Sequence, residues 1–181
     1  DNYINNDYEI ADINPLSIAN KKYELISNGK KISVMLFYGD ELVEFGNWLK
    51  QLFAESLGKH NFGYLPIVSK MTQDQHSLLQ LYLDGPRDKF FEIYSSDYNE
   101  SNDFINITLS NHKEAMIKTL ESENLPIIKV DSYEVENNKK ILSQLGYIFS
   151  NSILEALLLA ELGGVDPFGQ DAVEKQKNFL K

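Results

Sequence analysis

Apolar and polar positions follow two different rhythms along the chain, and these predict strands and helices in turn. The run KISVMLFY (Lys31–Tyr38) is continuously apolar and rich in β-branched and aromatic residues, which is typical of a buried strand. The stretch Asp40–Ser56 follows at once and repeats apolar residues at helical spacing. Gly58 and Lys59 then supply the glycine and the cation that commonly end a helix. These residues therefore predict a strand followed directly by an amphipathic helix.

The same alternation continues to the end of the chain. We expect further strands in YLPIVSK, KFFEIYS and PIIKVDSY, and an edge strand in FINITL at residues 104–109. We expect helices in DQHSLLQLYLD, SNHKEAMIKTLESENL, NNKKILSQLGYIFSNSILEALLLAELGG and QDAVEKQKNFLK. Strands that alternate with helices predict an α/β fold with a mainly parallel sheet covered on both faces. We interpret residues 30–164 as this domain, 1–29 as a polar lead and 165–181 as a C-terminal helix.

The composition is that of one globular domain. Of the 181 residues, 43% are hydrophobic and 24% are charged, and the formal net charge is −10. This acidity disfavours nucleic acid and anionic membranes as partners, because both carry negative charge. The sequence contains no cysteine, which excludes disulfides and thiolate chemistry and indicates a reducing cytoplasm.

Neither a metal site nor a membrane span is expected. The three histidines form no H-x-x-x-H pair. Glu155 and Glu161 interrupt the most apolar stretch, Ile153–Leu162, so we interpret it as part of a buried helix. The chain opens without an initiator methionine, and we interpret this as a cut behind an absent upstream domain.

Glu55 is the first candidate for chemistry. It lies about 20° outside the apolar arc of the first helix, beyond the edge set by Trp48, and Gln51 lies one turn earlier on the same flank. A carboxylate at such a border can be partly desolvated and act as a general base. The same spacing fits a solvated boundary glutamate, so the pattern leaves both interpretations open.

His76, Gln170 and Lys177 are the other candidates. His76 lies near the start of a helix that follows a strand, where open α/β sheets bind ligands, and an imidazole there suits proton transfer near neutral pH. Gln170 and Lys177 lie seven residues apart on one helical face and could hold sugar hydroxyls or a developing oxyanion. A capping histidine and a solvated terminal helix fit the same positions.

Three segments, taken together and in order, resemble the glucose-6-phosphate isomerase family. They are KQLFAESLGK, TQDQHSLLQLYLDGPRDK and DPFGQDAVEKQK, and the match extends over about residues 30–181 to the C-terminal half of that family. The last segment is similar to the family signature F-[DN]-Q-x-[GA]-V-E-x-x-K, with Gly169 where Asp or Asn is usual. The resemblance implies a sugar isomerase (SIS) fold, which is a flavodoxin-like three-layer αβα sandwich around a five-stranded parallel sheet.

The resemblance also implies an activity and a role for each candidate. It implies interconversion of glucose 6-phosphate and fructose 6-phosphate through a cis-enediol, without metal or organic cofactor. In the family pattern, Glu55 matches the base that moves a proton between C2 and C1. His76 matches a histidine that assists ring opening from the other subunit of a homodimer, and Lys177 matches a lysine near the ring oxygen. Gln51 and Gln170 match glutamines that position the substrate.

The resemblance further implies that this chain holds part of a site. The family's G-G-R arginine and its phosphate-binding loop lie in the N-terminal half, which is outside this sequence. We therefore expect the sugar phosphate substrate and the N-terminal domain of the same protein as partners, and the 181-residue piece to be inactive alone. Two alternatives remain, a non-catalytic SIS module that binds sugar phosphates and a plain dimerisation module.

Overall fold

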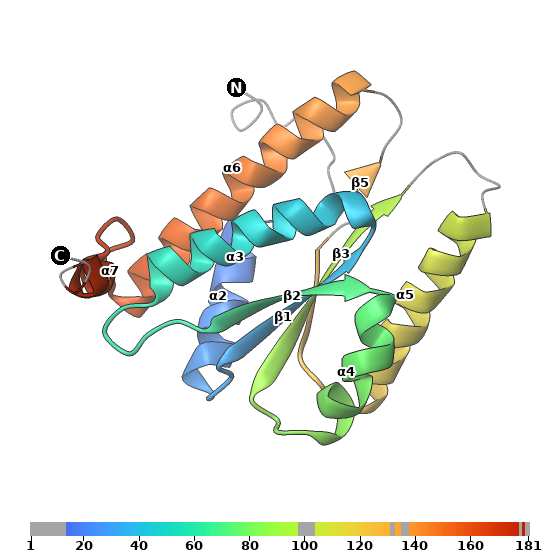
Figure 1. Ribbon diagram of the computed structural model, residues 1–181, viewed down its shortest axis with the longest axis horizontal. Helices are drawn as coiled ribbons and strands as arrows, with labels where there is room; N and C mark the ends of the chain where they lie inside the picture. The colour runs from blue at the N-terminus through green and yellow to red at the C-terminus, as the bar shows by residue number, and fades with distance from the viewer. Residues whose placement is uncertain (1–13, 98–103, 131–132, 135–137, 178, 180–181) are drawn as a thin grey trace.

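The fold is an α/β sandwich built on a parallel sheet. The computed structural model describes residues 14–97, 104–130, 133–134, 138–177 and 179 (Figure 1). Its strands are β1 (Ile32–Tyr38), β2 (Leu65–Met71), β3 (Lys89–Asp97), β4 (Ile127–Lys129) and β5 (Tyr133–Glu134). Four of them lie side by side in the order β2-β1-β3-β4, all parallel, and the two-residue β5 pairs with the end of β3. The parallel α/β sheet is confirmed, and the expected count of five full strands is slightly off.

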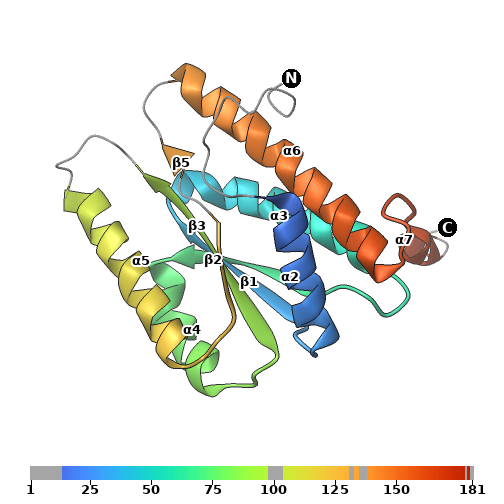
Figure 2. The ribbon, with the colours of Figure 1, turned by 180° about the vertical axis from the view of Figure 1, so that it is seen from behind.

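Helices cover both faces of this sheet. They are α2 (Pro15–Ser27), the 3-10 turn η1 (Asp40–Leu42), α3 (Val43–Leu57), α4 (Gln73–Asp84), α5 (Phe104–Ser122), α6 (Asn138–Gly163) and α7 (Asp171–Lys177). Figures 1 and 2 show α2, α3 and α6 on one face and α4 and α5 on the other. The short α7 stands beyond the end of α6, so the three layers are helices, sheet and helices.

The central strand β1 separates two apolar cores. Met35 and Phe37 join the core formed with α2, α3 and α6. Val34 and Leu36 point the other way and join the core formed with α4 and α5. Because side chains alternate across a strand, a strand buried on both faces reads as a continuous apolar run, which is how the sequence identified this one. Gly46 lets α3 lie close to β1, because a Cβ there would be 2.5 Å from the Phe37 ring.

The edge strand expected at residues 104–109 is wrong. These residues form the first turns of α5, and the Thr108 Oγ1 donates a hydrogen bond to the Phe104 carbonyl at 2.7 Å, a bond one helical turn long. Phe104, Ile105 and Ile107 are 80%, 62% and 51% exposed. Their alternation suggested a strand with one buried face, but none of these three apolar side chains is buried.

The segment expected to be a polar lead contains helix α2. The Asn14 side chain caps the helix by accepting from the Leu16 N–H at 3.0 Å, and Pro15 occupies the first turn, where its missing N–H is harmless. Ala19, Lys22 and Ile26 form its buried stripe. The packed domain therefore begins before residue 30, while residues 1–13 lie outside the described part of the chain.

Helix α6 contains a segment that resembles a membrane span in length and composition. Within α6, Leu145–Gly163 is long and apolar enough to cross a bilayer by length and composition alone, although its two glutamates had argued against a span. In this fold Ala156, Leu159 and Ala160 are buried in the core shared with α2 and α3. A core helix makes such contacts, so length and composition alone are weak evidence that α6 spans a membrane.

Candidate functional site

The Glu55 carboxylate lies between two side-chain amides. Gln51 Nε2 donates to Glu55 Oε1 at 3.0 Å, from one turn earlier on α3. Gln170 Nε2 donates to Glu55 Oε2 at 2.7 Å, from the residue just before α7. Residues 55 and 170 are 115 positions apart, so folding brings together three of the five residues that the sequence singled out.

This arrangement suits a base that must be both fixed and accessible. Each carboxylate oxygen accepts one amide hydrogen bond, which sets the direction of the carboxylate on its helix. All three side chains are exposed, so a ligand can reach them. An amide can also donate to a substrate hydroxyl or accept from one, and positioned acid–base groups are what proton transfer requires. The geometry supports proton abstraction by Glu55 with the two glutamines as positioning groups.

Lys177 lies near this site in the chain but is paired within its own helix. Its Nζ is 2.5 Å from Glu174 Oε1, three residues earlier in α7, and both side chains are exposed. α7 begins directly after Gln170, so the short helix that carries Lys177 starts beside the Gln170 end of the site. In the described residues, the structure brings Gln170 to Glu55 and leaves Lys177 bonded to Glu174.

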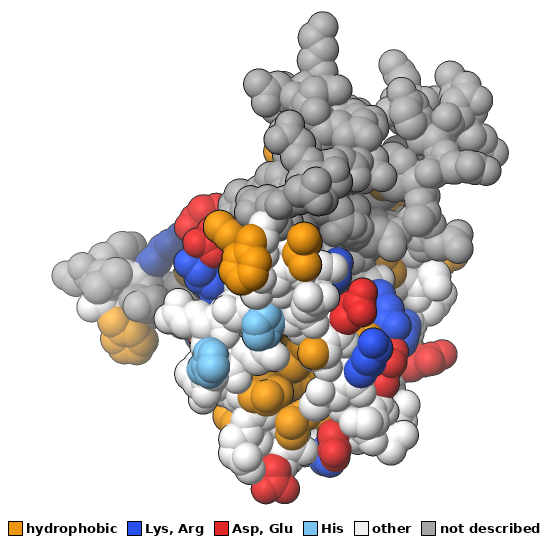
Figure 3. Space-filling model, turned by 90° about the vertical axis from the view of Figure 1, so that its right-hand side faces the viewer, with side chains coloured by type: hydrophobic (Ala, Val, Ile, Leu, Met, Phe, Trp, Pro, Cys, Tyr) orange, Lys and Arg blue, Asp and Glu red, His pale blue; other side chains and the backbone are white. Residues whose placement is uncertain are grey.

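His76 is on the other side of the sheet. It lies in the first turns of α4 and is exposed, whereas Glu55 is on α3 across the sheet (Figures 1 and 2). Figure 3 views the α4 and α5 side and shows histidine side chains beside an apolar area. Three exposed apolar side chains lie on these two helices: Leu81 on α4, and Ile105 and Ile107 on α5. Within one chain, the structure does not bring His76 to Glu55.

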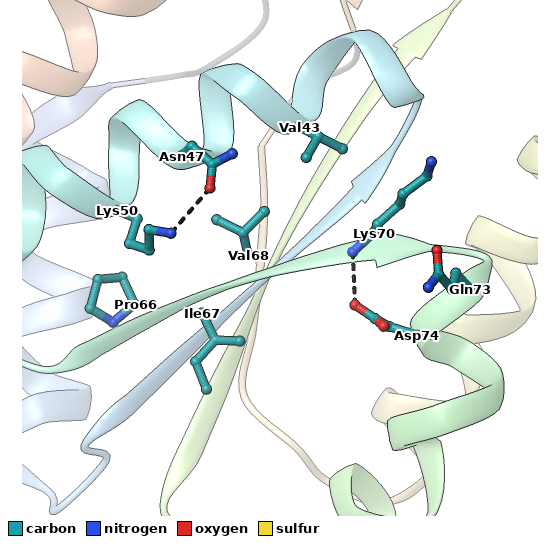
Figure 4. A pocket seen from close by; sticks show the side chains of 9 residues that line it. All are labelled: Val43, Asn47, Lys50, Pro66, Ile67, Val68, Lys70, Gln73 and Asp74. Carbon is teal, nitrogen blue, oxygen red and sulfur yellow. Dashed lines mark hydrogen bonds between the residues drawn. The ribbon is translucent and has the colours of Figure 1, made fainter.

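A groove follows the exposed edge strand β2 between α3 and α4. Its volume is about 460 Å³. It is lined by Val43, Asn47, Lys50, Pro66, Ile67, Val68, Lys70, Gln73 and Asp74 (Figure 4). Lys70 Nζ pairs with Asp40 at 2.9 Å, and its backbone N–H donates to the Asp74 carboxylate at 2.9 Å. Of the two lysines that line the groove, Lys70 is thus paired with a carboxylate, while Lys50 bonds to the Asn47 amide oxygen. None of the five candidate residues lines the groove.

Comparison with known proteins gives the family. The chain is 34% identical over 166 residues to a glucose-6-phosphate isomerase of Methanocaldococcus jannaschii, a match covering 83% of this chain and 40% of the relative. It is 31% identical over 168 residues to a probable glucose-6-phosphate isomerase of Methanococcus maripaludis, covering 86% of this chain and 37% of the relative. The chain is homologous to part of glucose-6-phosphate isomerase. No family model matches it.

Known structures agree on the fold of this isomerase homologue. A crystal structure of a glucose-6-phosphate isomerase from Chlamydia trachomatis superposes with a TM-score of 0.72 at 14% identity, covering 92% of this chain and 37% of that chain. A hypothetical protein from Thermus thermophilus superposes with a TM-score of 0.73 at 21% identity, covering 91% of this chain and 44% of that chain. The chain thus spans about two fifths of the length of the isomerases that it matches.

The isomerase homologue also contains a buried charge cluster that the sequence analysis missed. Lys22 Nζ of α2 is 2.8 Å from Glu92 Oε2 of β3 and 2.5 Å from Glu155 Oε1 of α6, and the Lys22 and Glu92 side chains are fully buried. Glu92 also accepts from Ser33 Oγ at 2.5 Å and from Tyr94 OH at 2.8 Å. The sequence did contain a sign of this cluster, because Lys22 and Glu155 are charged residues at positions on the buried face of a helix.

Two carboxylates share one ammonium in this cluster, and the pKa values of Glu155 and Lys22 are shifted. Burial raises the pKa of Glu155 to about 7; Lys22 opposes this rise and Glu92 adds to it. Burial works against the charge on Lys22, but the carboxylates of Glu155 and Glu92 outweigh it and raise the pKa of Lys22 well above its ordinary value. Lys22 therefore stays charged, and Glu155 is the member of the cluster that takes up a proton near neutral pH.

The cluster makes stability depend on pH. Because folding raises the pKa of Glu155 from 4.5 to about 7, its stabilising contribution is fully present below the unfolded value and is lost as pH rises through the folded value. Between about pH 5 and pH 8, wild type should lose about 2 kcal/mol of unfolding free energy relative to Glu155→Gln, which mimics the protonated side chain. Urea denaturation of both proteins across this range measures the difference. If the unfolding free energies of the two proteins changed equally with pH, the assignment of Glu155 as the titrating group would be wrong.

Proposed function

We propose that this chain is part of a glucose-6-phosphate isomerase in which Glu55 is the base of an aldose–ketose isomerisation. The observation that carries the proposal is the Glu55 carboxylate held by the amides of Gln51 and Gln170. Relatives that are at least 30% identical and named glucose-6-phosphate isomerase support it. The proposed reaction converts glucose 6-phosphate and fructose 6-phosphate into each other.

The chemistry needs one carboxylate that can reach two neighbouring carbons. In the forward direction, Glu55 removes the proton from C2 of the open-chain sugar while O1 gains a proton, which gives a cis-enediol. Glu55 then returns its proton to C1 while O2 loses its hydroxyl proton, so the proton count balances. Gln51 and Gln170 keep the carboxylate in one orientation and offer hydrogen bonds to sugar hydroxyls. Lys177, freed from Glu174, acts near the ring oxygen during ring opening.

The developing enediolate needs a fixed cation or donor, and this must come from elsewhere in the protein. Glu55 accepts from two neutral amides, and Lys177 is paired with Glu174. We therefore expect an N-terminal domain to supply this group and the phosphate-binding loop. The proposed SIS domain alone is expected to be inactive, and the complete enzyme is expected in the cytoplasm.

His76 is proposed to serve the site of a second subunit. It is exposed on the face opposite Glu55, so one chain cannot present both groups to one sugar. The same face carries the exposed Leu81, Ile105 and Ile107, which a partner could cover. In a homodimer with two-fold symmetry, each subunit would then give Glu55 to one site and His76 to the other.

Mixing two impaired variants of the full-length protein tests both the activity and the dimer. Glu55→Gln and His76→Ala should each be strongly impaired. If His76 acts across an interface, each heterodimer of the two variants contains one intact site of its two. Equal mixing makes about half of all dimers heterodimers, so co-refolded protein should recover about a quarter of wild-type turnover. A coupled assay with fructose 6-phosphate measures this recovery.

The outcomes separate the alternatives. Recovery supports the shared site. No recovery from two impaired variants shows that Glu55 and His76 act in the same subunit, which overturns the dimer proposal alone. Full turnover by Glu55→Gln favours a non-catalytic sugar-phosphate-binding or dimerisation module instead. His112→Ala, a half-buried histidine on α5, is the matched control and should retain wild-type turnover.

A further inference from the structure

The end of α3 and the segment between α6 and α7 are joined by one lysine. Lys59 follows the Gly58 cap of α3, and its Nζ donates a hydrogen bond to the backbone carbonyl of Asp166, 107 residues away. Lys59 comes four residues after Glu55, and Asp166 comes four residues before Gln170. The Lys59 contact therefore crosses between the same two segments as the Glu55–Gln170 hydrogen bond.

The segment 164–170, which we call the α6–α7 loop, is well anchored at its start. Val165 is buried in the core, and its N–H donates to the Ala160 carbonyl at 3.0 Å. Just before the loop, Gly163 lies against the Phe62 ring so closely that a Cβ would be 2.3 Å from the ring. These contacts fix where the loop leaves α6.

The other end of the α6–α7 loop has fewer supports. Gln170 is exposed, and α7 beyond it is a short helix whose described side chains are exposed. Within the loop, Asp166 Oδ1 accepts from the Phe168 N–H at 3.0 Å, so the residue whose carbonyl Lys59 binds also forms a local turn. A contact that holds this turn against α3 also sets the distance from Gln170 to Glu55.

We propose that Lys59 is a positioning residue that holds the α6–α7 loop against α3, so that the Gln170 amide stays on the Glu55 carboxylate. The bond is charge-assisted, which makes it stronger than a neutral one, and Lys59 is half-buried, which limits screening. Lys59 acts through Gln170 and does not touch the sugar. The inference rests on the proposed function of Glu55.

A double-mutant cycle in the full-length protein tests this role. Lys59→Met should lower kcat about fivefold, because the bond to the loop is worth about 1 kcal/mol. Lys59→Arg keeps the charge and donors and should restore most of the loss. In a Gln170→Leu background, Lys59→Met should cause no further loss, because its effect passes through the missing amide. Lys50→Met removes a lysine of α3 that bonds to Asn47 instead of the loop, and it should leave kcat unchanged.

A second measurement does not depend on activity. Amide hydrogen exchange over residues 165–173 should become faster in Lys59→Met and stay unchanged in β1, because only the loop loses its support. An unchanged exchange rate in this segment would overturn the inference. So would an equal loss of kcat from Lys59→Met in the presence and absence of Gln170.

The cycle also separates this inference from the proposed function. If Gln170→Leu lowers kcat while Lys59→Met has no effect, the positioning role is wrong and the function of Glu55 stands. If Gln170→Leu and Glu55→Gln both leave turnover unchanged, the proposed function fails and the role of Lys59 fails with it.

Discussion

Replacing Glu55 with Gln in the full-length protein is expected to reduce isomerase turnover by about 10³-fold, within the range that a general base contributes. The amide has nearly the shape of the carboxylate, so it can still pack between Gln51 and Gln170, but it cannot accept the sugar's proton at neutral pH. Substrate affinity should change by less than about threefold, because the lost interaction acts on the moving proton. A coupled assay over a range of substrate concentrations separates kcat from KM.

The matched control for this experiment lies on the same helix. Glu44 is exposed in the first turn of α3, and its carboxylate accepts a hydrogen bond from Asn47 at 3.4 Å. Glu44→Gln should keep wild-type kcat. Incubation with substrate in heavy water gives a direct readout, since Glu55→Gln should also stop deuterium entering C1 and C2. Wild-type turnover by Glu55→Gln would refute the role of this residue as the base.

Replacing Lys22 with Met is expected to lower the free energy of unfolding by about 3–5 kcal/mol. The variant leaves the carboxylates of Glu92 and Glu155 buried without their shared cation, and it removes the Nζ that lies 4.3 Å from the centre of the Phe53 ring. Typical domains are stable by only about 5–15 kcal/mol, so the loss is a large part of the total. Urea unfolding followed by circular dichroism measures it.

Two comparisons show whether the charge cluster causes this loss. Lys118→Met removes an exposed lysine 3.7 Å from Glu114 and should change stability by less than about 1 kcal/mol. Adding Glu92→Gln and Glu155→Gln to Lys22→Met removes both unpaired charges and should recover part of the loss. If Lys22→Met is no worse than Lys118→Met, the buried ion pairs do not hold α2 to the sheet.

The sequence predicted best those features that local pattern determines. β1 is a continuous apolar run, and α3 has an amphipathic stripe and a glycine at its end, so both were placed within a few residues. The pairing of Gln51 with Glu55 also follows from helical spacing, since residues four apart are neighbours on a helix. Local sequence patterns were therefore enough to predict the helix that holds Glu55, the proposed base.

Features that depend on distant partners were harder to predict. The apolar alternation of residues 104–109 favoured a strand, but whether a strand forms depends on a neighbour to pair with, and these residues form the first turns of α5 instead. The pairing of Lys22 with Glu92 and Glu155 was not predicted, because these three residues lie on three different elements. Gln170 reached Glu55 through folding of the whole domain, and only the family resemblance had suggested it.

The bond between Glu55 and Gln170 also sets when the site can be assembled. Because 115 residues separate the two partners, α3 and Gln51 leave the ribosome well before the second amide has been synthesised. Domains fold largely as units during synthesis, and contacts between distant residues form late. A nascent chain stopped after α6 would thus carry the sheet, the charge cluster and Glu55, with the carboxylate held by one amide. The base reaches its complete setting only when the segment beyond α6 folds back onto α3.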